Sequence, residues 1–505
     1  MTPAETRLVR GTAAVVAGLV LLRLIAAAWT PLTFDEAYYW MWSKHLAGGY
    51  YDHPPMVAIV IRLGTLLAGN TEFGVRLVSV LLTLPMSWAV YRTAELLFGG
   101  TRIAASAVLL LNATMIVSVG TMIVTPDAPL LVASSFVLLT LAKVLATGRG
   151  LWWLGVGLAV GAALLSKYTA MFFGPAILIW LVAVPKLRRW LVSPWPYLGG
   201  LVALAVFSPV ILWNADHQWV SFIKQLGRAR IDSFSAAYVA ELIPTQFMFA
   251  SPLVFILGAM GLYALMRRDG GAWPSRLLIS ATLWTIVLYF VWHAFHARVE
   301  ANWFAPVYPS VAIAAAVAAH LAIWQPRERR TVDFCLRWAG PVGVVMFTAL
   351  VVQANTGLLS GYRRDASVRS IGVGFKELAG EIDAARLRTG ATCVLAPDYG
   401  TVGWLSFYLP EGTCVVQSGQ RIRWVNMPEP SPAQLAGPLL LVGEANAAQQ
   451  PEWQARFSQI EKIATLTRKR GALVIEDVDL HVLAGARGDP LDRSLPPELE
   501  LPAAR

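Results

Sequence analysis

Stretches of about 20 mostly apolar residues, each long enough to cross the hydrocarbon core of a membrane, recur along most of this chain. Of its 505 residues, 56% are hydrophobic and only 14% are charged, whereas a soluble domain carries roughly 25% charged residues. The sequence therefore predicts a polytopic α-helical membrane protein. We expect about eleven spans, at residues 8–29, 74–98, 102–120, 128–147, 151–166, 169–185, 195–213, 247–266, 276–293, 302–324 and 337–358.

Basic residues gather in alternate loops between these spans. Loops rich in Lys and Arg stay on the cytoplasmic side, so we expect the N-terminus inside and the other loops to face outward. The same distribution accounts for the excess of 41 Lys and Arg over 31 Asp and Glu, and no nucleic-acid partner is expected. The basic loops carry Arg7, Arg10, Arg102, Lys143, Arg149, Lys186, Arg188, Arg189, Arg267, Arg268, Arg327, Arg329 and Arg330.

The first apolar run, residues 11–29, allows a second interpretation. Two arginines precede it and Ala26–Ala28 resembles a cleavage site, as in a secretory signal peptide. We expect an uncleaved first helix, because the chain that follows is also membrane-embedded and a carboxylate motif comes directly after it.

The composition changes near residue 360, where the long apolar runs end. Residues 375–387 and 453–463 are predicted to be helices, and residues 393–396, 439–443 and 473–476 to be buried strands. This alternation is typical of a small α/β domain.

We therefore divide the chain into three parts: a transmembrane domain at 1–358, an outer α/β domain at 359–490 and a disordered tail at 491–505. The outer loop 30–73 belongs to the first part and is expected to contain interfacial helices, since its apolar segment 54–69 is too short to span.

Cys393 and Cys414 both fall in the outer domain. An extracytoplasmic compartment permits a disulfide, so we expect these cysteines to be bridged. Two buried free thiols are the alternative.

Two adjacent carboxylates, Asp35 and Glu36, follow the first span, in the sequence Thr33-Phe-Asp-Glu-Ala-Tyr-Tyr39. Carboxylates beside a membrane are costly and usually functional. One of them could act as a general base for an acceptor hydroxyl, or could bind a divalent cation. The structural alternative is that Asp35 caps the following helix.

Further polar groups lie in the other outward loops. Asp127 opens a predicted span, where it either caps the helix or joins a shared site with Asp35. Lys167 lies between two apolar runs and either snorkels or binds a phosphate. Arg298 suits a phosphate because its guanidinium matches two oxygens. His53 could contact a phosphate or a metal.

The segment that contains Arg298 also carries Glu300, Asn302 and two histidines, His293 and His296. Glu300 is expected to orient Arg298 or to contact a sugar. The spacing of the histidines allows a metal site, but packing at the membrane interface explains it equally well.

These motifs, taken in order, resemble the GT-C glycosyltransferases, in particular the bacterial family 39/83 group with its aminoarabinose–lipid A transferases and protein O-mannosyltransferases. The resemblance covers roughly residues 8–325, and the outer α/β region is also similar. The motifs are Phe34-Asp-Glu-Ala-Tyr-Tyr39, Asp52-His-Pro-Pro55, Thr125-Pro-Asp-Ala-Pro129 and Glu300-Ala-Asn-Trp-x-Ala-Pro-x-Tyr-Pro309.

The resemblance implies an integral membrane enzyme that moves a sugar from a polyprenyl-phosphate carrier to an extracytoplasmic acceptor, commonly by inverting displacement. Asp35 matches the family's catalytic carboxylate and Asp127 a second acidic position. The chain departs from the aminoarabinose transferases at His53, where they have Lys, and at Asp52, where they have Glu. Aminoarabinose is therefore not assigned as the donor sugar.

We accordingly predict a bacterial inner-membrane glycosyltransferase whose site and outer domain face the periplasm, with a glycolipid, glycan or protein as acceptor. A transporter or flippase for lipid-linked sugars and a non-catalytic assembly protein are the alternatives. No cofactor is certain, and a divalent metal ion is kept open. The predicted catalytic residues are Asp35, Glu36 and Asp127; the donor phosphate ligands His53, Lys167 and Arg298; the substrate contacts Tyr38, Tyr39, Asp52, Glu300 and Asn302.

Overall fold

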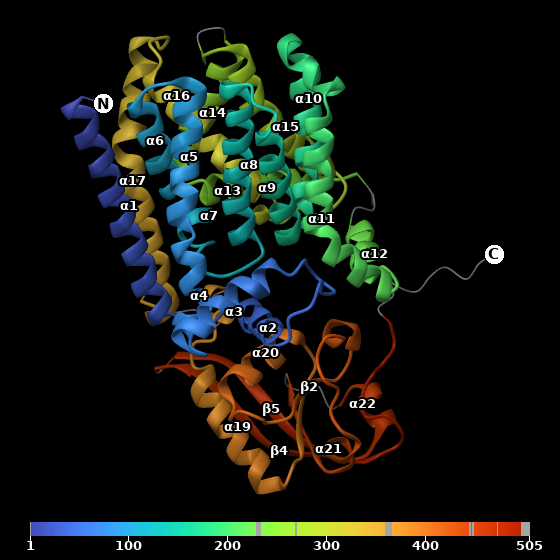
Figure 1. Cartoon of the computed structure of the whole chain (residues 1–505). Coiled ribbons are helices and arrows are strands. Elements are labelled where there is room, and N and C mark those ends of the chain that lie inside the picture. Colours follow the sequence, from blue (N-terminus) through green and yellow to red (C-terminus); the bar gives the residue numbers. More distant parts are fainter. Residues whose placement is uncertain are drawn as a thin grey trace. The chain divides into compact units, whose positions relative to one another are not determined.

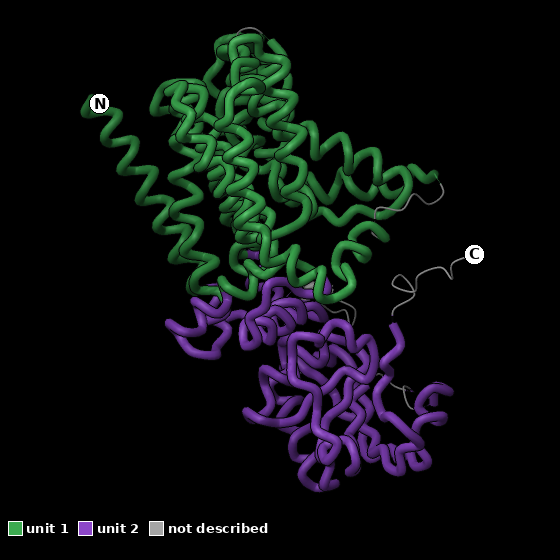
Figure 2. The backbone as a smooth tube through the Cα atoms, turned by 45° about the vertical axis from the view of Figure 1, so that its right-hand side comes forward, with its two compact units in different colours: residues 1–25, 53–60, 76–348 green, residues 26–52, 61–75, 349–505 purple. Residues whose placement is uncertain are grey.

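The computed structural model describes residues 2–228, 234–267, 270–358, 366–443, 446, 449–471 and 473–495. The chain divides into two compact units, which Figure 2 distinguishes by colour. Unit 1 comprises residues 1–25, 53–60 and 76–348, and unit 2 comprises residues 26–52, 61–75 and 349–505. Unit 2 thus includes part of the loop 30–73, which the sequence assigned to the transmembrane domain. The predicted tail lies outside the described residues from 496 onward.

Unit 1 is helical, and α5, α8 and α9 pack side by side in it (Figure 1). Small residues allow close packing: a Cβ at Gly157 of α9 would lie 2.1 Å from the carbonyl oxygen of Gly199 in α11. Such contacts are typical of helices in membranes. The helices lying wholly or partly in unit 1 are α1 (Pro3–Trp29), α3 (Met56–Ala68), α4 (Glu72–Leu81), α5 (Thr83–Phe98), α6 (Thr101–Asn112), α7 (Met115–Ser118), α8 (Asp127–Thr147), α9 (Trp152–Ser166), η1 (Tyr168–Phe172), α10 (Phe173–Ala183), η2 (Pro185–Val192), α11 (Pro194–Asp216), α12 (Val220–Arg228), α13 (Ala237–Phe249), α14 (Pro252–Met266), α15 (Trp273–Ala294), η4 (Ala301–Val307), α16 (Tyr308–His320) and α17 (Pro326–Thr356).

Within the described residues, seven helices are long and apolar enough to cross a membrane, or up to nine if each of two bent pairs forms one span. This confirms a polytopic helical membrane protein but gives fewer spans than the eleven predicted. Two predicted spans, 102–120 and 151–166, are not among them. These segments contain α6 and α9, which are 12 and 15 residues long. At 1.5 Å per residue, both helices are shorter than the roughly 30 Å hydrocarbon core.

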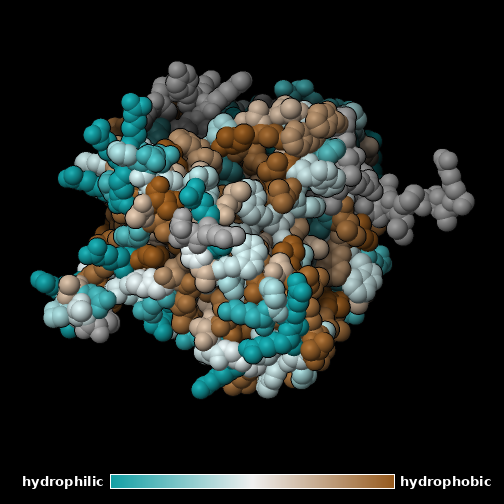
Figure 3. Space-filling model, turned by 90° about the horizontal axis from the view of Figure 1, so that it is seen from above, coloured by the Kyte–Doolittle hydropathy of each residue, from teal (hydrophilic) through white to brown (hydrophobic). Residues whose placement is uncertain are grey.

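Large apolar side chains are exposed on the helices of unit 1, as expected where lipid is the solvent. Figure 3 shows hydrophobic residues reaching the surface beside hydrophilic ones. Examples are Leu21, Ile25, Leu204, Leu212 and Leu288.

Unit 2 contains a five-stranded mixed sheet in the order β2-β1-β3-β5-β4. Strand β1 pairs in parallel with β2 and β3, whereas β5 pairs antiparallel with β3 and β4. The predicted disulfide between Cys393 of β1 and Cys414, just before β2, is present and confirmed. The elements of unit 2 are α2 (Phe34–Lys44), α18 (Ala366–Arg369), α19 (Phe375–Thr389), β1 (Cys393–Ala396), α20 (Tyr399–Tyr408), β2 (Val415–Gln417), η5 (Arg421–Trp424), α21 (Pro432–Ala436), β3 (Leu439–Gly443), α22 (Pro451–Arg456), β4 (Phe457–Arg470) and β5 (Leu473–Ala486).

Most predicted elements of this domain are confirmed, including the helix that begins at Phe375 and the strands at 393–396, 439–443 and 473–476. The predicted helix at 453–463 is wrong. A short helix ends at Arg456, and a 14-residue strand follows from Phe457. Pairing with β5 along that length satisfies the backbone groups of β4 and overrides the helical pattern.

Candidate active site

Asp35 is the second residue of α2, which begins at Phe34. The Asp35 side chain does not cap this helix. The N-cap is Thr33, and it forms a capping box with Glu36. Glu36 Oε2 accepts hydrogen bonds from Thr33 N at 2.9 Å and Thr33 Oγ1 at 3.2 Å. The alternative in which Asp35 caps the helix is therefore wrong, and buried Glu36 is occupied in this structural role.

The segment before α2 is fixed by the C-terminal part of unit 2. Gly372 N donates to Leu32 O at 2.8 Å, and Trp404 Nε1 donates to the same oxygen at 2.9 Å. Helix α20 lies against α2 so closely that a Cβ at Gly403 would come within 2.9 Å of Tyr38 N. The outer domain thus positions the carboxylate motif.

Asp35 is half-buried, and its carboxylate accepts a hydrogen bond from Tyr399 Oη of α20 at 3.0 Å. Burial raises the pKa of the Asp35 carboxyl from 3.8 to about 6; the Tyr399 hydrogen bond opposes this rise, and the neighbouring charges of Asp52 and Glu36 add to it. A carboxyl group with this pKa is mostly ionised at neutral pH and can still take up a proton, which suits a general base.

A second network lies beside this one in unit 2. Asp52 accepts from Tyr38 Oη at 2.8 Å, and Arg423 Nη1 donates to both Asp52 oxygens at 2.8 and 2.7 Å. The Arg423 guanidinium also lies 4.8 Å from the centre of the Tyr399 ring. Arg423 therefore links Asp52 to the residue that holds Asp35.

Predicted substrate contacts Tyr38 and Tyr39 are almost fully buried. Burial raises the pKa of both phenols far above 10, so they act as neutral hydrogen-bonding groups. Their rings contact each other and Trp42 at centroid distances of 4.9 to 5.8 Å. They form a rigid wall of this site.

In unit 1, Asp127, Lys167 and Asn302 come together from three separate segments. Lys167 Nζ contacts the Asp127 oxygens at 2.7 and 2.9 Å, and Asn302 Nδ2 donates to Asp127 Oδ2 at 2.6 Å. Asp127 and Lys167 are both buried. Asp127 is the first residue of α8, whose N-cap is Pro126. Within unit 1, the structure thus brings together three of the predicted site residues: Asp127, Lys167 and Asn302.

The remaining predicted donor ligands differ in exposure. The side chain of Arg298 is 61% exposed; it binds Glu241 Oε1 at 2.7 Å and lies 4.0 Å from Glu300. His53 is partly buried in the segment 53–60 of unit 1. A common site for these residues and Asp35 stays a prediction, because Asp35 belongs to the other unit.

The two histidines of the same region are explained by packing. His293 is buried and stacks on Tyr289 at 6.0 Å, and His296 Nδ1 lies 3.0 Å from Trp292 O. In the described part of the chain, no group of three or more His, Cys, Asp or Glu side chains is arranged to hold a metal ion. The divalent cation kept open from the sequence stays untested.

Sequence reasoning missed Tyr399 and Arg423. Both lie in the outer domain, more than 360 residues after the carboxylates that they contact. Neither belongs to a motif, and only tertiary structure brings them to α2.

Comparison with known proteins supports the interpretation of the motifs. The family model of dolichyl-phosphate-mannose-protein mannosyltransferases matches residues 52–213. The lipid A galacturonosyltransferase RgtD of Rhizobium johnstonii is 28% identical over 322 residues, which cover 61% of this chain and 64% of that protein. The aligned region thus spans less than two thirds of the relative's length.

Among solved structures, ArnT from Cupriavidus metallidurans bound to undecaprenyl phosphate matches with a TM-score of 0.65 and 18% identity, covering 93% of this chain and 98% of ArnT. The apo form of ArnT matches with a TM-score of 0.64 and 17% identity, covering 94% of this chain and 98% of ArnT. Together these findings confirm the resemblance drawn from the motifs: this multi-pass membrane protein has the fold of ArnT and is similar to membrane glycosyltransferases.

Proposed function

We propose that this protein transfers a sugar from a polyprenyl-phosphate carrier to an extracytoplasmic acceptor, with Asp35 as the general base. The observation that carries the proposal is the environment of the Asp35 carboxylate. Its carboxylate is not needed to cap α2, it accepts a hydrogen bond only from a tyrosine among the described residues, and burial raises its pKa to about 6.

In the proposed reaction, Asp35 accepts the proton of an acceptor hydroxyl while the oxygen of that hydroxyl attacks the anomeric carbon of the donor sugar. The bond between that carbon and the phosphate oxygen breaks, and its electron pair leaves with the polyprenyl phosphate. Inversion at the anomeric carbon follows from a single displacement. Negative charge grows on the leaving phosphate, so a cation that contacts it favours the transition state.

Arg298 is the best candidate for that cation. Its guanidinium is largely exposed and is held by Glu241, so it presents remaining N–H donors to a ligand. Lys167 is already neutralised by buried Asp127, which favours a structural role for it. His53 stays a third candidate.

The relatives support a lipid-linked donor and a glycolipid acceptor for this chain. The solved ArnT structure contains undecaprenyl phosphate, and RgtD is named for transfer to lipid A. We therefore propose lipid A or a related envelope glycan as the acceptor ahead of a protein. The donor sugar is left open.

The test is direct. Purified full-length protein is incubated with polyprenyl-phosphate sugars and lipid A, and released polyprenyl phosphate is measured by mass spectrometry. Acceptor-dependent release supports the proposal. Movement of the intact donor across vesicles without release would instead favour the transporter.

The proposed location is the bacterial inner membrane, with the outer domain in the periplasm. This orientation rests on the alternating basic loops. A reporter active only in the cytoplasm and fused after Gly372 is expected to be silent. Activity of that reporter would contradict both the orientation and the extracytoplasmic reaction.

A further inference from the structure

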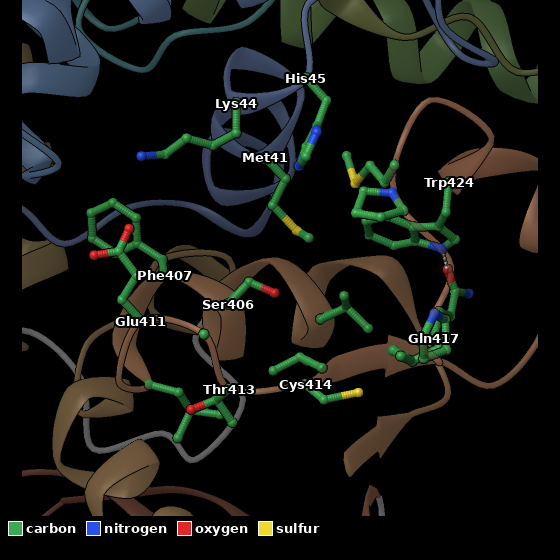
Figure 4. Close-up of a pocket in the computed structure, with 18 of the residues that line it drawn as sticks. Met41, Lys44, His45, Ser406, Phe407, Glu411, Thr413, Cys414, Gln417 and Trp424 are labelled. Atoms are coloured by element: carbon green, nitrogen blue, oxygen red, sulfur yellow. Dashed lines mark hydrogen bonds between the residues drawn. The ribbon is translucent and has the colours of Figure 1, made fainter. Parts of the chain in front are cut away.

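A cavity of about 630 Å³ opens within unit 2, between the C-terminal half of α2 and the segment from α20 to η5 (Figure 4). Its volume lies within the roughly 300–1,000 Å³ usual for small-molecule sites. Met41 and Lys44 of α2 line one side, and Ser406 and Phe407 of α20 line another. None of the residues predicted from the sequence to bind substrate lines it.

Aromatic rings in this cavity are held in fixed positions. Trp40 packs edge-on against Phe407 at a centroid distance of 4.9 Å, and its Nε1 donates to Asn70 at 3.2 Å. Trp424 donates to Gln417 Oε1 at 2.9 Å. Rings that are fixed before binding lose little conformational freedom when a ligand arrives.

The polar groups of the cavity include both donors and acceptors. Lys44 and Arg421 are balanced in charge by Glu411 and Glu429, and Arg421 binds Glu429 at 2.6 Å. A phosphate or polyanion would need an excess of cations, which this set does not supply. A neutral ligand with many hydroxyl groups suits it better.

The pair formed by Arg421 and Glu429 offers an acceptor to a ligand. The side chain of Arg421 is only 10% exposed, whereas that of Glu429 is 44% exposed, and both residues line the cavity. The Glu429 carboxylate can therefore accept a hydrogen bond from a ligand hydroxyl, while Arg421 holds that carboxylate in place.

We propose that this cavity binds a neutral pyranose unit of the acceptor glycan. The apolar C–H face of a pyranose packs on aromatic rings, and its hydroxyls pair with groups such as Lys44 and Glu429. The inference rests on the proposed glycosyl transfer and names the acceptor's sugar class. Trp424 lines the cavity, while its neighbour Arg423 binds Asp52 in the network beside Asp35, so both sites share one short helix, η5.

The test measures binding separately from turnover. Full-length protein in detergent is titrated with dephosphorylated core oligosaccharide from lipopolysaccharide, and binding is followed by saturation-transfer NMR. Trp40→Ala is expected to weaken binding at least tenfold. Trp88→Ala, which removes an exposed tryptophan of α5 outside the cavity, is the matched control and should bind normally.

Ser406→Phe provides a second variant, because it fills the cavity without removing a ring. Unchanged oligosaccharide binding in both cavity variants overturns the proposal, as does the absence of binding to the wild-type protein. Binding of an extended peptide that depends on Trp40 would overturn it in favour of a protein acceptor. Specific oligosaccharide binding without any sugar transfer would leave this inference standing and refute only the proposed activity.

Discussion

The two outward carboxylates predicted as partners, Asp35 and Asp127, are held in opposite ways. Asp127 is buried against a lysine and an asparagine, so its charge is neutralised where it stands. Asp35 receives one hydrogen bond from a neutral tyrosine, and burial raises its pKa to about 6. A salt-bridged carboxylate stabilises structure, whereas one without a salt-bridge partner can exchange a proton. The comparison therefore supports our proposal that Asp35 is the base, and it favours a structural role for Asp127.

The largest expected effect comes from Asp35→Asn. The amide keeps the size of the side chain but cannot accept the proton, so turnover should fall roughly 10²–10⁴-fold, the usual range for general acid–base catalysis. Initial rates of polyprenyl phosphate release measure this. Expression and the melting temperature should stay near those of the wild type.

Glu36→Gln is the matched control for that variant. Gln caps a helix at this position as Glu does, so the capping box survives and turnover should persist. A loss equal to that of Asp35→Asn would move the base to Glu36, and unchanged turnover in Asp35→Asn would remove Asp35 from the mechanism.

The second prediction concerns stability. Lys167→Met leaves Asp127 buried without its cation, and breaking one side of a buried pair costs roughly 3–5 kcal/mol. Thermal unfolding in detergent should show a clear drop, largely reversed in the double variant Lys167→Met/Asp127→Asn. Arg298→Gln breaks an exposed pair with Glu241 and should leave the melting temperature close to that of the wild type, because water screens such pairs.

A different outcome would break the comparison. If Lys167→Met melted like the wild type but lost transfer, the pair would belong to the reaction rather than to the scaffold. Lys167 would then return as a ligand of the donor phosphate.

The same residues show which parts of the candidate site could be predicted from the sequence. Asp35, Asp127, Lys167 and Asn302 were predicted as site residues because they are polar groups beside apolar runs, and a membrane leaves few reasons to place charge there. Their hydrogen-bond partners could not be predicted. The capping box that separates Glu36 from Asp35 depends on where α2 begins, and helix boundaries follow from local geometry that a motif does not specify.

The outer domain shows a second limit. The strands at Cys393 and Leu439 were correct because short apolar runs are distinctive. The strand β4 was mistaken for a helix because pairing with β5 decides its state. Tyr399 and Arg423 could not be found for a related reason: long-range contacts leave no local pattern.

The third prediction is a pH dependence. The pKa of Asp35 is raised to about 6, and the ionised form is the base, so activity is retained above this value and lost as pH falls through it. At pH 5, one unit lower, about one tenth of the carboxyl groups remain ionised and turnover should fall about tenfold. Rates measured from pH 4.5 to 8.5 at saturating donor test this. An acid limb near pH 4 would show that Asp35 is not desolvated during the reaction.

The smallest effect is expected from Tyr399→Phe. This variant removes the hydrogen bond that Asp35 accepts, in contrast to the salt bridge that Asp127 forms. Removing the hydroxyl keeps the ring packed on Tyr38 at 4.8 Å but deletes the bond that opposes the raised pKa. A hydrogen bond to a charged group contributes about 1.5–3 kcal/mol, and one pKa unit corresponds to about 1.4 kcal/mol. The acid limb should therefore move up by about one to two units, with turnover near pH 7 falling about two- to tenfold. Tyr408 lies in the same helix as Tyr399, and its hydroxyl donates to Glu72. Tyr408→Phe removes this hydroxyl and should leave the acid limb of the pH profile in place. An unmoved limb in Tyr399→Phe, or an equal shift in both variants, would show that the Tyr399 hydroxyl does not set the proton affinity of Asp35.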